Sequence, residues 1–431
     1  MRIRIDGRDY GALRNLSFAP ETDLSGASLP VNAFEAEIDT SDAIEAGQYA
    51  RLYDDRERLW AKYWIALAER IHPDMVRLRA ESDAAVLDGV TLPAVYYSGA
   101  SVTSVLDETL VVATGAPGIV ARMDYAIDGS LIHRTLTGFC PEQTARERLT
   151  WILLVLGAQA RTAFNECLTI LPTGETARLA PPEDTFWRPS VSFGDVVTAI
   201  RLKYYAFAPG TPQPTDRWVK DDQGAVYLVT EHALTLSNPH SPADAPENTV
   251  SVEGVYLVNA DNAGDVANAL ARWAFSRASV TADVIDNGDI APGDKLTVYT
   301  DEAALRTGWV RRAEFRFGVQ ARARLELLAC EAVAAGRLRI VYRWADFTLN
   351  TADYTFPVGY GYAVENPWFD QSFNGCRRVF RPLEPAAEGT VTAQPATVYE
   401  DYAPALAFTA GVLEIISVDG LTADGGTVQI A

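Results

Sequence analysis

The sequence has few of the residues from which metal sites and disulfide frameworks are built. Its 431 residues include four cysteines and four histidines. No two cysteines form a CxxC pair, and the histidine spacing matches no metal-binding motif. This pattern excludes a zinc motif and a dense disulfide scaffold, so we expect free, buried thiols and predict no metal site and no cofactor. The residues concerned are Cys140, Cys167, Cys330, Cys376, His72, His133, His232 and His240.

Basic residues are also scarce relative to acidic ones. The chain has 37 lysines and arginines against 57 aspartates and glutamates, which gives a formal net charge of −20. Because phosphate neutralisation needs clustered basic side chains, a nucleic-acid-binding surface is not expected. DNA can still pass close to such a protein without being held.

Long apolar runs are missing as well. The longest one, from Trp151 to Leu156, is far too short to cross a bilayer. The first residues, Met1 to Asp6, alternate as in a strand and do not resemble a secretory leader. We therefore expect no integral membrane segment and no secretory signal.

The common enzyme motifs GxSxG, GxGxxG, HExxH, SxxK and the P-loop do not occur, which leaves one candidate nucleophile. Cys140 directly precedes a predicted helix, where the pKa of a thiol is lowered. A cysteine hydrolase also needs a base, and His133 is only seven residues upstream. No third group that would orient this histidine is evident. We interpret Cys140 as a packing residue and predict no catalytic residue.

Two acidic clusters are interpreted as turns rather than as sites. Asp54, Asp55 and Glu57 join two predicted strands, a position where carboxylates are normally solvated. The stretch DVIDNGDIAPGD, residues 283–294, lacks the glutamate that an EF-hand loop has at its twelfth position.

Residues 1–90 show the alternation that is typical of β-strands. Tyr49 to Tyr53 and Leu59 to Ile65 alternate with period two and are joined by an acidic turn, which predicts a hairpin with one wet face. Several strands at this spacing favour a small barrel or sandwich.

Residues 91–175 predict an α/β subdomain. The segment SVTSVLDETL has capping residues and helical spacing, which indicates a short helix. In GFCPEQTARERLTWILLVLGAQA we expect Cys140 at the N-cap, Pro141 at the first helical position and Glu142 in the first turn. This helix, residues 141–157, is apolar on nearly every side and is therefore expected to be buried.

The rest of the chain returns to strand patterns. Residues 176–332 predict a second β-barrel with one packed helix, which Asp261 or Asn262 caps. Residues 333–431 predict a C-terminal β-rich domain. The predicted fold class is thus mainly β with an α+β insertion, consisting of two small β-barrels, an α/β subdomain and a C-terminal β domain. No internal repeat of fixed period is visible.

The order of these segments resembles the tail hub proteins of bacteriophage baseplates. The resemblance covers about residues 1–330 and rests on patterns of strand, helix and turn rather than on reactive residues. It is carried by FEAEIDTSD, GQYARLYDDRERLWAKYWIALAERIHPDMVRLRAESD, GFCPEQTARERLTWILLVLGAQA, VTAIRLKYYAF and VNADNAGDVANALARWAFSRASVTADVIDNGDIAPGDKLTVYT.

The resemblance implies a homotrimer in which two similar barrels per chain form a pseudo-sixfold ring. Such a ring joins the hexameric tail tube to the threefold tail tip and continues the lumen through which DNA passes. The implied partners are a distal tail or tail tube protein, the tape-measure protein, and a tail spike or fibre. The implied location is the tail tip of a virion that is assembled in the host cytoplasm.

Two alternatives to a structural hub subunit stay open at this point. The aromatic residues Tyr360, Tyr362, Trp368, Phe369 and Phe373 are compatible with a receptor- or carbohydrate-binding tail-tip protein, because sugars stack on exposed rings. Alternating aromatic residues also occur in ordinary β cores. A tail-associated cell-wall hydrolase is the other alternative, and it would depend on Cys140.

Overall fold

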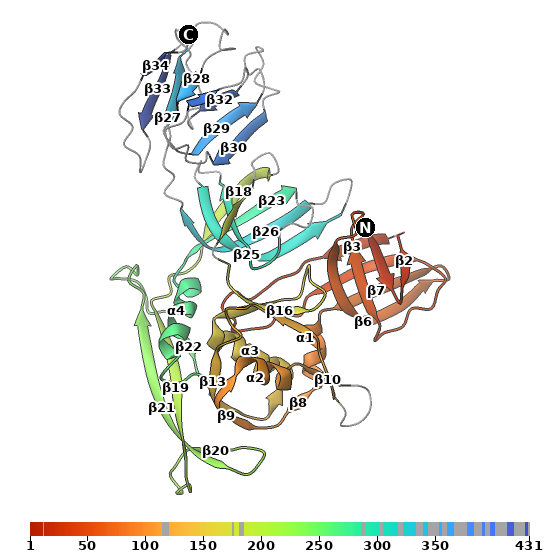
Figure 1. Cartoon of the computed structure of the whole chain (residues 1–431), viewed down its shortest axis with the longest axis vertical. Helices are drawn as coiled ribbons and strands as arrows, with labels where there is room; N and C mark the ends of the chain where they lie inside the picture. The colour runs from red at the N-terminus through yellow and green to blue at the C-terminus, as the bar shows by residue number, and fades with distance from the viewer. Residues whose placement is uncertain are drawn as a thin grey trace.

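The computed structural model describes residues 1–332 except residue 12 and residues 114–119, 175, 181–184, 286–289, 301–304 and 318–321. Beyond residue 332 it describes only the backbone of short strands. Most elements are strands and the helices are few, which confirms the prediction of a mainly β fold with small α insertions (Figure 1).

The N-terminal strands form what we call the first β unit. They pair in the order β3-β4-β7-β6-β5-β1-β2, and every neighbouring pair is antiparallel. The predicted hairpin is present, with Tyr49 opposite Trp64. The strands are β1 (Arg2–Ile5), β2 (Arg8–Tyr10), β3 (Leu13–Phe18), β4 (Ala33–Asp39), β5 (Tyr49–Tyr53), β6 (Leu59–His72) and β7 (Met75–Glu81).

A second β unit is built from strands much later in the chain. Its order is β18-β23-β26-β25-β24-β17, and β25 also pairs with β3. The two β units are therefore parts of one 13-stranded sheet. The strands are β17 (Ala177–Leu179), β18 (Thr185–Phe193), β23 (Ala278–Ile285), β24 (Lys295–Tyr299), β25 (Leu305–Arg316) and β26 (Arg322–Ala332).

An α/β region lies between the two β units in sequence and packs around helix α3, as Figure 1 shows. The predicted short helix is present as α2, and the side chain of Ser101 caps it by accepting a hydrogen bond from the Ser104 amide. The elements are α1 (Asp83–Val86), η1 (Leu87–Gly89), β8 (Thr91–Leu92), β9 (Val95–Ser101), α2 (Val102–Thr109), β10 (Val111–Ala113), β11 (Val120–Arg122), β12 (Tyr125–Ile127), β13 (Thr135–Cys140), β14 (Gln143–Thr144), α3 (Ala145–Leu156), β15 (Ala158–Arg161) and β16 (Leu168–Pro172).

Helix α3 is buried, but its predicted start at Cys140 and Pro141 is wrong. The helix begins at Ala145 and is capped by Thr144, whose hydroxyl accepts a hydrogen bond from the Glu147 amide while the Glu147 carboxylate accepts one from the Thr144 amide. This capping box satisfies two amides that would otherwise lack partners. Cys140 instead ends strand β13, where it lies opposite Val95 of β9.

Residues 199–274 form a four-stranded sheet, in the order β20-β21-β19-β22, and helix α4. Helix α4 begins after Asn262, one of the two predicted capping residues, although its side chain makes no capping hydrogen bond. Ile200, Leu202 and Leu270 belong to the same apolar core as α3, so the segment 176–332 contributes to two cores. The elements are β19 (Ala199–Pro209), β20 (Trp218–Lys220), β21 (Val226–Ser237), β22 (Thr249–Val252) and α4 (Ala263–Ala274).

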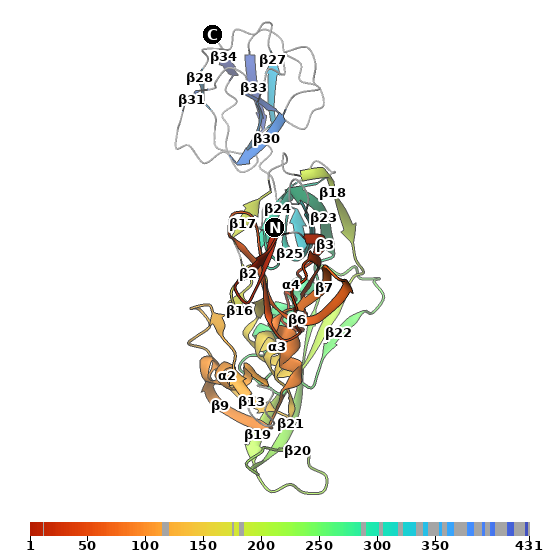
Figure 2. The same cartoon turned by 90° about the vertical axis from the view of Figure 1, so that its right-hand side faces the viewer.

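The C-terminal strands pair only among themselves within the part of the chain that the structure describes. Figures 1 and 2 both place them at the end of the molecule opposite β20. They are β27 (Arg339–Arg343), β28 (Asp353–Thr355), β29 (Tyr360–Glu365), β30 (Arg377–Pro382), β31 (Thr390–Thr392), β32 (Thr397–Glu400), β33 (Val412–Ser417) and β34 (Thr427–Gln429).

Candidate functional site: the Cys140 region, an open cavity and the joint between the β units

The thiol of Cys140 is enclosed in the core around α3 and is fully inaccessible to solvent. Burial raises its pKa to about 12, and the nearby Arg148 guanidinium only partly opposes this. Because the thiolate is the nucleophile, a thiol with this pKa is inert at neutral pH. His133 is exposed in the segment before β13. These observations support a packing role for Cys140.

The other cysteines and histidines do not converge on a site. Cys330 is buried and its pKa is raised to about 12 by burial, and Cys167 is half-buried with a pKa that burial also raises. His72 contacts Asp74, and the ring of His232 stacks on Tyr204 at 5.0 Å between centroids. Among the described residues no group of three or more His, Cys, Asp and Glu side chains could hold a metal ion. Cys376 lies outside the described residues.

The carboxylate of Asp54 organises its own turn. It accepts hydrogen bonds from the amides of Arg56 and Arg58 at 2.8 and 2.9 Å and from Nε of Arg58 at 2.7 Å. Burial opposes ionisation, but these hydrogen bonds outweigh it and lower the pKa of Asp54. Glu57 pairs with Arg2, and Asp55 lies 2.8 Å from the N-terminal amine. The cluster therefore anchors the start of the chain at this turn.

The second acidic stretch also contains a turn. The Asp294 carboxylate accepts a hydrogen bond from the Ala291 amide at 2.9 Å and one from Nη2 of Arg161 at 2.8 Å. Residues 286–289 of this stretch lie outside the described residues. Of the aromatic residues near the C-terminus, Tyr360 and Tyr362 fall in β29, while Trp368, Phe369 and Phe373 lie outside the described residues.

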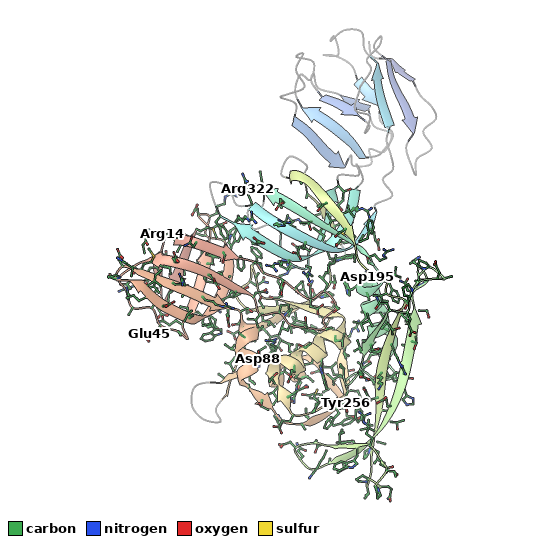
Figure 3. All side chains as sticks on the ribbon, turned by 180° about the vertical axis from the view of Figure 1, so that it is seen from behind. Arg14, Glu45, Asp88, Asp195, Tyr256 and Arg322 are labelled. Atoms are coloured by element: carbon green, nitrogen blue, oxygen red, sulfur yellow. The ribbon has the colours of Figure 1, made fainter. Side chains whose placement is uncertain are left out.

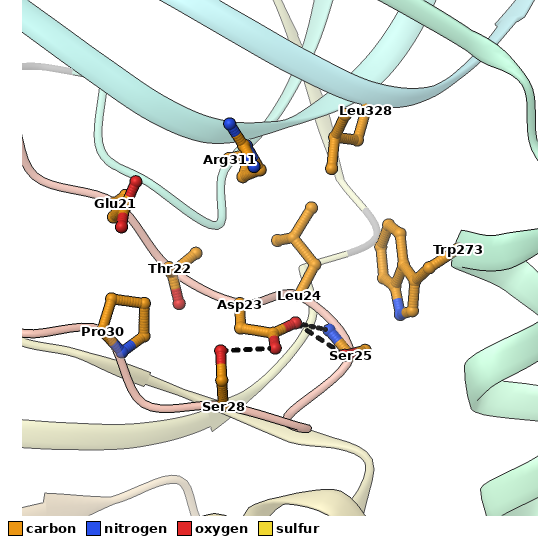
Figure 4. A pocket seen from close by; sticks show the side chains of 10 residues that line it. All are labelled: Glu21, Thr22, Asp23, Leu24, Ser25, Ser28, Pro30, Trp273, Arg311 and Leu328. Atoms are coloured by element: carbon orange, nitrogen blue, oxygen red, sulfur yellow. Dashed lines mark hydrogen bonds between the residues drawn. The ribbon is translucent and has the colours of Figure 1, made fainter. Parts of the chain in front are cut away.

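An open cavity of about 280 Å³ lies where the two β units meet α4 (Figure 4). Of its two lining carboxylates, that of Asp23 accepts hydrogen bonds from the Ser25 amide, the Ser25 hydroxyl and the Ser28 hydroxyl at 2.6–2.8 Å. Arg311, on the opposite wall, pairs with Glu326 at 2.8 Å. The lining contains no histidine, lysine or cysteine, and its Ser25 and Ser28 hydroxyls donate to Asp23 as part of the local turn. The cavity is lined by Glu21, Thr22, Asp23, Leu24, Ser25, Ser28, Pro30, Trp273, Arg311 and Leu328.

The joint between the two β units lies next to this cavity, since Glu21, Thr22 and Arg311 belong to both. Phe18 of β3 lies opposite Phe315 of β25, and their rings stack at 5.7 Å between centroids. The chain then follows β25 further: the Ala313 amide donates to the Pro20 carbonyl at 3.0 Å, and the Thr22 amide donates to the Arg311 carbonyl at 2.9 Å. Residues 17–22 thus cover the edge of β25 from residue 311 to residue 316.

Sequence reasoning did not single out Phe18 or Phe315, because an apolar residue at a strand end is ordinary without its partner. A signal was present in the short similarity between Leu16-Ser17-Phe18 and Val191-Ser192-Phe193. Three residues are too few to define a repeat without the surrounding structure.

Comparison with solved structures identifies tail proteins, one of them from a prophage, as similar in fold. The tail protein from Neisseria meningitidis MC58 has a TM-score of 0.53 at 13% identity, with 76% of this chain and 95% of that chain covered. The 43 kDa tail protein of prophage MuSo2 from Shewanella oneidensis has a TM-score of 0.50 at 10% identity, with 76% and 97% covered. No protein-family model matches the chain, and no curated protein matches it in sequence.

The chain therefore has the fold of phage and prophage tail proteins, and the predicted resemblance is confirmed at this level. None of the helices that the structure describes is long and apolar enough to cross a membrane.

Proposed function

We propose that this protein is a structural hub subunit of a bacteriophage tail or a phage-derived particle. In this proposal three copies form a pseudo-sixfold ring, to which each chain contributes its two β units. The ring joins the hexameric tail tube to the threefold tail tip and continues the lumen for DNA. The observation that carries the proposal is the edge-to-edge pairing of two β units through Phe18 and Phe315 in a chain with a tail-protein fold.

The charge of the chain suits a lumen that DNA crosses. The excess of acidic over basic residues would repel phosphate, so DNA could slide past without being trapped. The proposed partners are a distal tail or tail tube protein, the tape-measure protein, and a spike or fibre. The proposed location is the tail tip of the particle, after assembly in the host cytoplasm.

The proposal assigns no catalytic activity to the chain. The enclosed thiol of Cys140 and the locally satisfied carboxylates of Asp23 and Asp54 support a structural role. In domain terms we propose 1–90 as the first barrel, 91–175 as the bracing subdomain, 176–332 as the second barrel and 333–431 as the C-terminal domain. Residues 199–274 of the third part would strengthen the brace, because they share its core.

The ring can be tested by measuring mass and shape together. Native mass spectrometry of the purified chain should give three times the mass of one subunit, and negative-stain images should show an annulus with six similar lobes. A chain that stays monomeric at all concentrations, or images of a ring with a different number of lobes, would contradict the proposal.

A further inference from the structure

The two β units repeat the same strand order. The first unit runs β3-β4-β7-β6-β5, and the second runs β18-β23-β26-β25-β24. All neighbouring strands in both series are antiparallel. Strand β3 therefore corresponds to β18, and β6 corresponds to β25.

A shared irregularity fixes the residue correspondence between β6 and β25. Each of these strands pairs with the strand before it and with the strand after it. Just beyond the point where pairing with the preceding strand ends, the register against the following strand shifts by one residue, between Ile65 and Leu67 in β6 and between Val310 and Arg312 in β25. A β-bulge of this kind is a built-in feature of a strand rather than a defect. Counting onward from the bulge, Arg70 of β6 corresponds to Phe315 of β25. Past Arg70, β6 has a further register shift against β7, between Arg70 and His72, which β25 does not share.

Strands β3 and β18 align at their C-terminal ends. Phe18 ends β3 and lies opposite Phe34 near the start of β4, while Phe193 ends β18 and lies opposite Ala278 at the start of β23. The residues before them match as well, Leu16-Ser17 and Val191-Ser192. Phe193 is thus the counterpart of Phe18.

The two counterparts differ sharply in burial. Phe18 is 1% exposed because it is stacked on Phe315, whereas Phe193 is 58% exposed. On β6, the segment that corresponds to the covered edge of β25 leaves Leu67 48% and Ile71 38% exposed. These are three of the four large apolar side chains that are exposed among the described residues, the fourth being Trp218.

Phe193 and the exposed segment of β6 cannot meet within one chain. Figure 3 places Asp195, two residues after Phe193, on the side of the molecule away from Arg14 and Glu45 of the first β unit. Beyond Ile65, β6 pairs only with β7 among the described strands, so its other edge is open there. An open strand edge with exposed apolar side chains favours pairing with another strand.

We infer that the end of β18 in one copy pairs with the open edge of β6 in the next copy, in the register of the Phe18–Phe315 joint. This places Phe193 opposite Arg70, Ser192 opposite Ile71, and Val196 opposite Leu67 of the neighbouring copy. The occupant is a second copy of this chain because the joint inside the chain is itself the template for the contact. The inference rests on the proposed function and specifies the interface that closes the ring.

The pairing is head-to-tail, since a different surface is used on each side of the contact. Contacts of this kind close into a ring when the rotation per step divides a full turn, and otherwise form a filament. If the contact between copies repeats the geometry of the contact within the chain, the six β units of three copies are equivalent around one axis. A closed trimer then leaves no open edge of this type.

Charged substitutions test the surface. Phe193→Asp and Leu67→Asp should each shift the midpoint of trimer dissociation by roughly a hundredfold in protein concentration, because each removes a central apolar contact. Trp218→Asp is the matched control, since Trp218 is also a large, exposed apolar residue but lies on β20. It should leave the midpoint unchanged. Circular dichroism and thermal unfolding of the dilute variants verify that each remains folded.

Disulfide trapping tests the register. Residues directly opposite in an antiparallel pair have Cα atoms about 4.5–5.5 Å apart, within the range that a disulfide spans. The double variant Ser192→Cys with Ile71→Cys should give covalent dimers and trimers on mild oxidation. Each single variant, and the pair Ser190→Cys with Ile71→Cys, should give far less.

The outcomes separate this inference from the proposed function. A trimer that Phe193→Asp leaves intact, or crosslinking that is equal in the shifted pair, would overturn the interface while the hub assignment stands. A wild-type chain that stays monomeric would overturn both. Dissociation by Phe193→Asp together with an intact Trp218→Asp trimer is the result we expect.

Discussion

The ring of Phe18 lies nearly parallel to the ring of Phe315, with 5.7 Å between centroids and 18° between planes. Trp60 and Phe164 pack around this pair, with ring centroids 5.4 Å apart from each other. The stack therefore joins residues from both β units and from the segment after β15. It holds together parts of the chain that are almost 300 residues apart, since Phe18 and Phe315 are separated by 297 positions.

Truncation of Phe18 should destabilise the folded chain strongly. Phe18→Ala removes a fully buried ring from this cluster, and such substitutions typically cost about 3–5 kcal/mol of unfolding free energy. The control is Phe193→Ala at the corresponding position of β18, which should change the unfolding free energy of the dilute monomer by about 0.5 kcal/mol or less. Chemical denaturation followed by tryptophan fluorescence measures both. Equal effects of the two substitutions would contradict the assigned difference in burial.

The capping box of α3 gives a second prediction. Thr144→Ala removes the hydroxyl that accepts from the Glu147 amide, which should lower the unfolding free energy by about 1 kcal/mol. Pro141→Ala is the control, because Pro141 lies outside the helix and should have the smaller effect. If Pro141→Ala were the more destabilising of the two, the helix would start nearer Cys140.

The sequence allowed many local elements to be predicted but not the relations between them. The hairpin through Tyr49 and Trp64, the helix α2 and the start of α4 follow from alternation and spacing, which act over a few residues. The start of α3 was misplaced because Pro141 is a strong local signal, whereas the pairing of Cys140 with Val95 depends on a strand far from it in sequence.

The resemblance implied two similar barrels, but the residue correspondence between them could not be predicted for the same physical reason. Strand order and the position of a bulge are properties of pairing, and few side chains are needed to keep them. Phe18 and Phe193 occur in nearly identical triplets, yet one is buried and the other exposed. The difference depends on whether a partner edge exists in the same chain, which no local pattern contains. The predicted absence of catalytic residues stays a prediction.

The buried thiol of Cys140 should make stability depend on alkaline pH. Its pKa is raised to about 12 in the folded chain, against about 8.5 in an unfolded chain. Between these values the unfolded state has lost the proton that the folded state keeps, so stability falls as the pH rises. Its contribution is fully present below about pH 8.5 and is lost as the pH approaches 12.

The measurement compares wild type with Cys140→Ala. The unfolding free energy of the wild type should fall more steeply from pH 8.5 upward than that of the variant, because Cys330 and the buried tyrosines are common to both. At neutral pH a thiol reagent should modify Cys140 only after denaturant is added. Rapid modification of Cys140 in the native chain would contradict its enclosure.

Gly26 offers a test of how the first β unit is fixed to the α/β region. The residue has a φ of 71°, and a Cβ atom there would lie 2.7 Å from the carbonyl oxygen of Ala158 and 2.9 Å from the carbonyl carbon of Leu153. Both are backbone atoms at the end of α3 and the start of β15, so neither can move aside cheaply. Gly26→Ala should therefore force the loop of residues 21–30 away from α3.

The matched control is Gly7→Ala, because Gly7 has a similar φ of 80° but a Cβ atom there would meet nothing within 4 Å beyond its own chain neighbours. Both variants carry the cost of placing alanine at positive φ, about 1 kcal/mol. Only Gly26→Ala adds the steric term, which for overpacking of a close contact is typically about 1–3 kcal/mol. Thermal unfolding of the two variants should thus differ by several degrees, with Gly26→Ala the less stable. Identical melting temperatures would mean that the loop of residues 21–30 yields without loss, and that it does not fix the first β unit to α3.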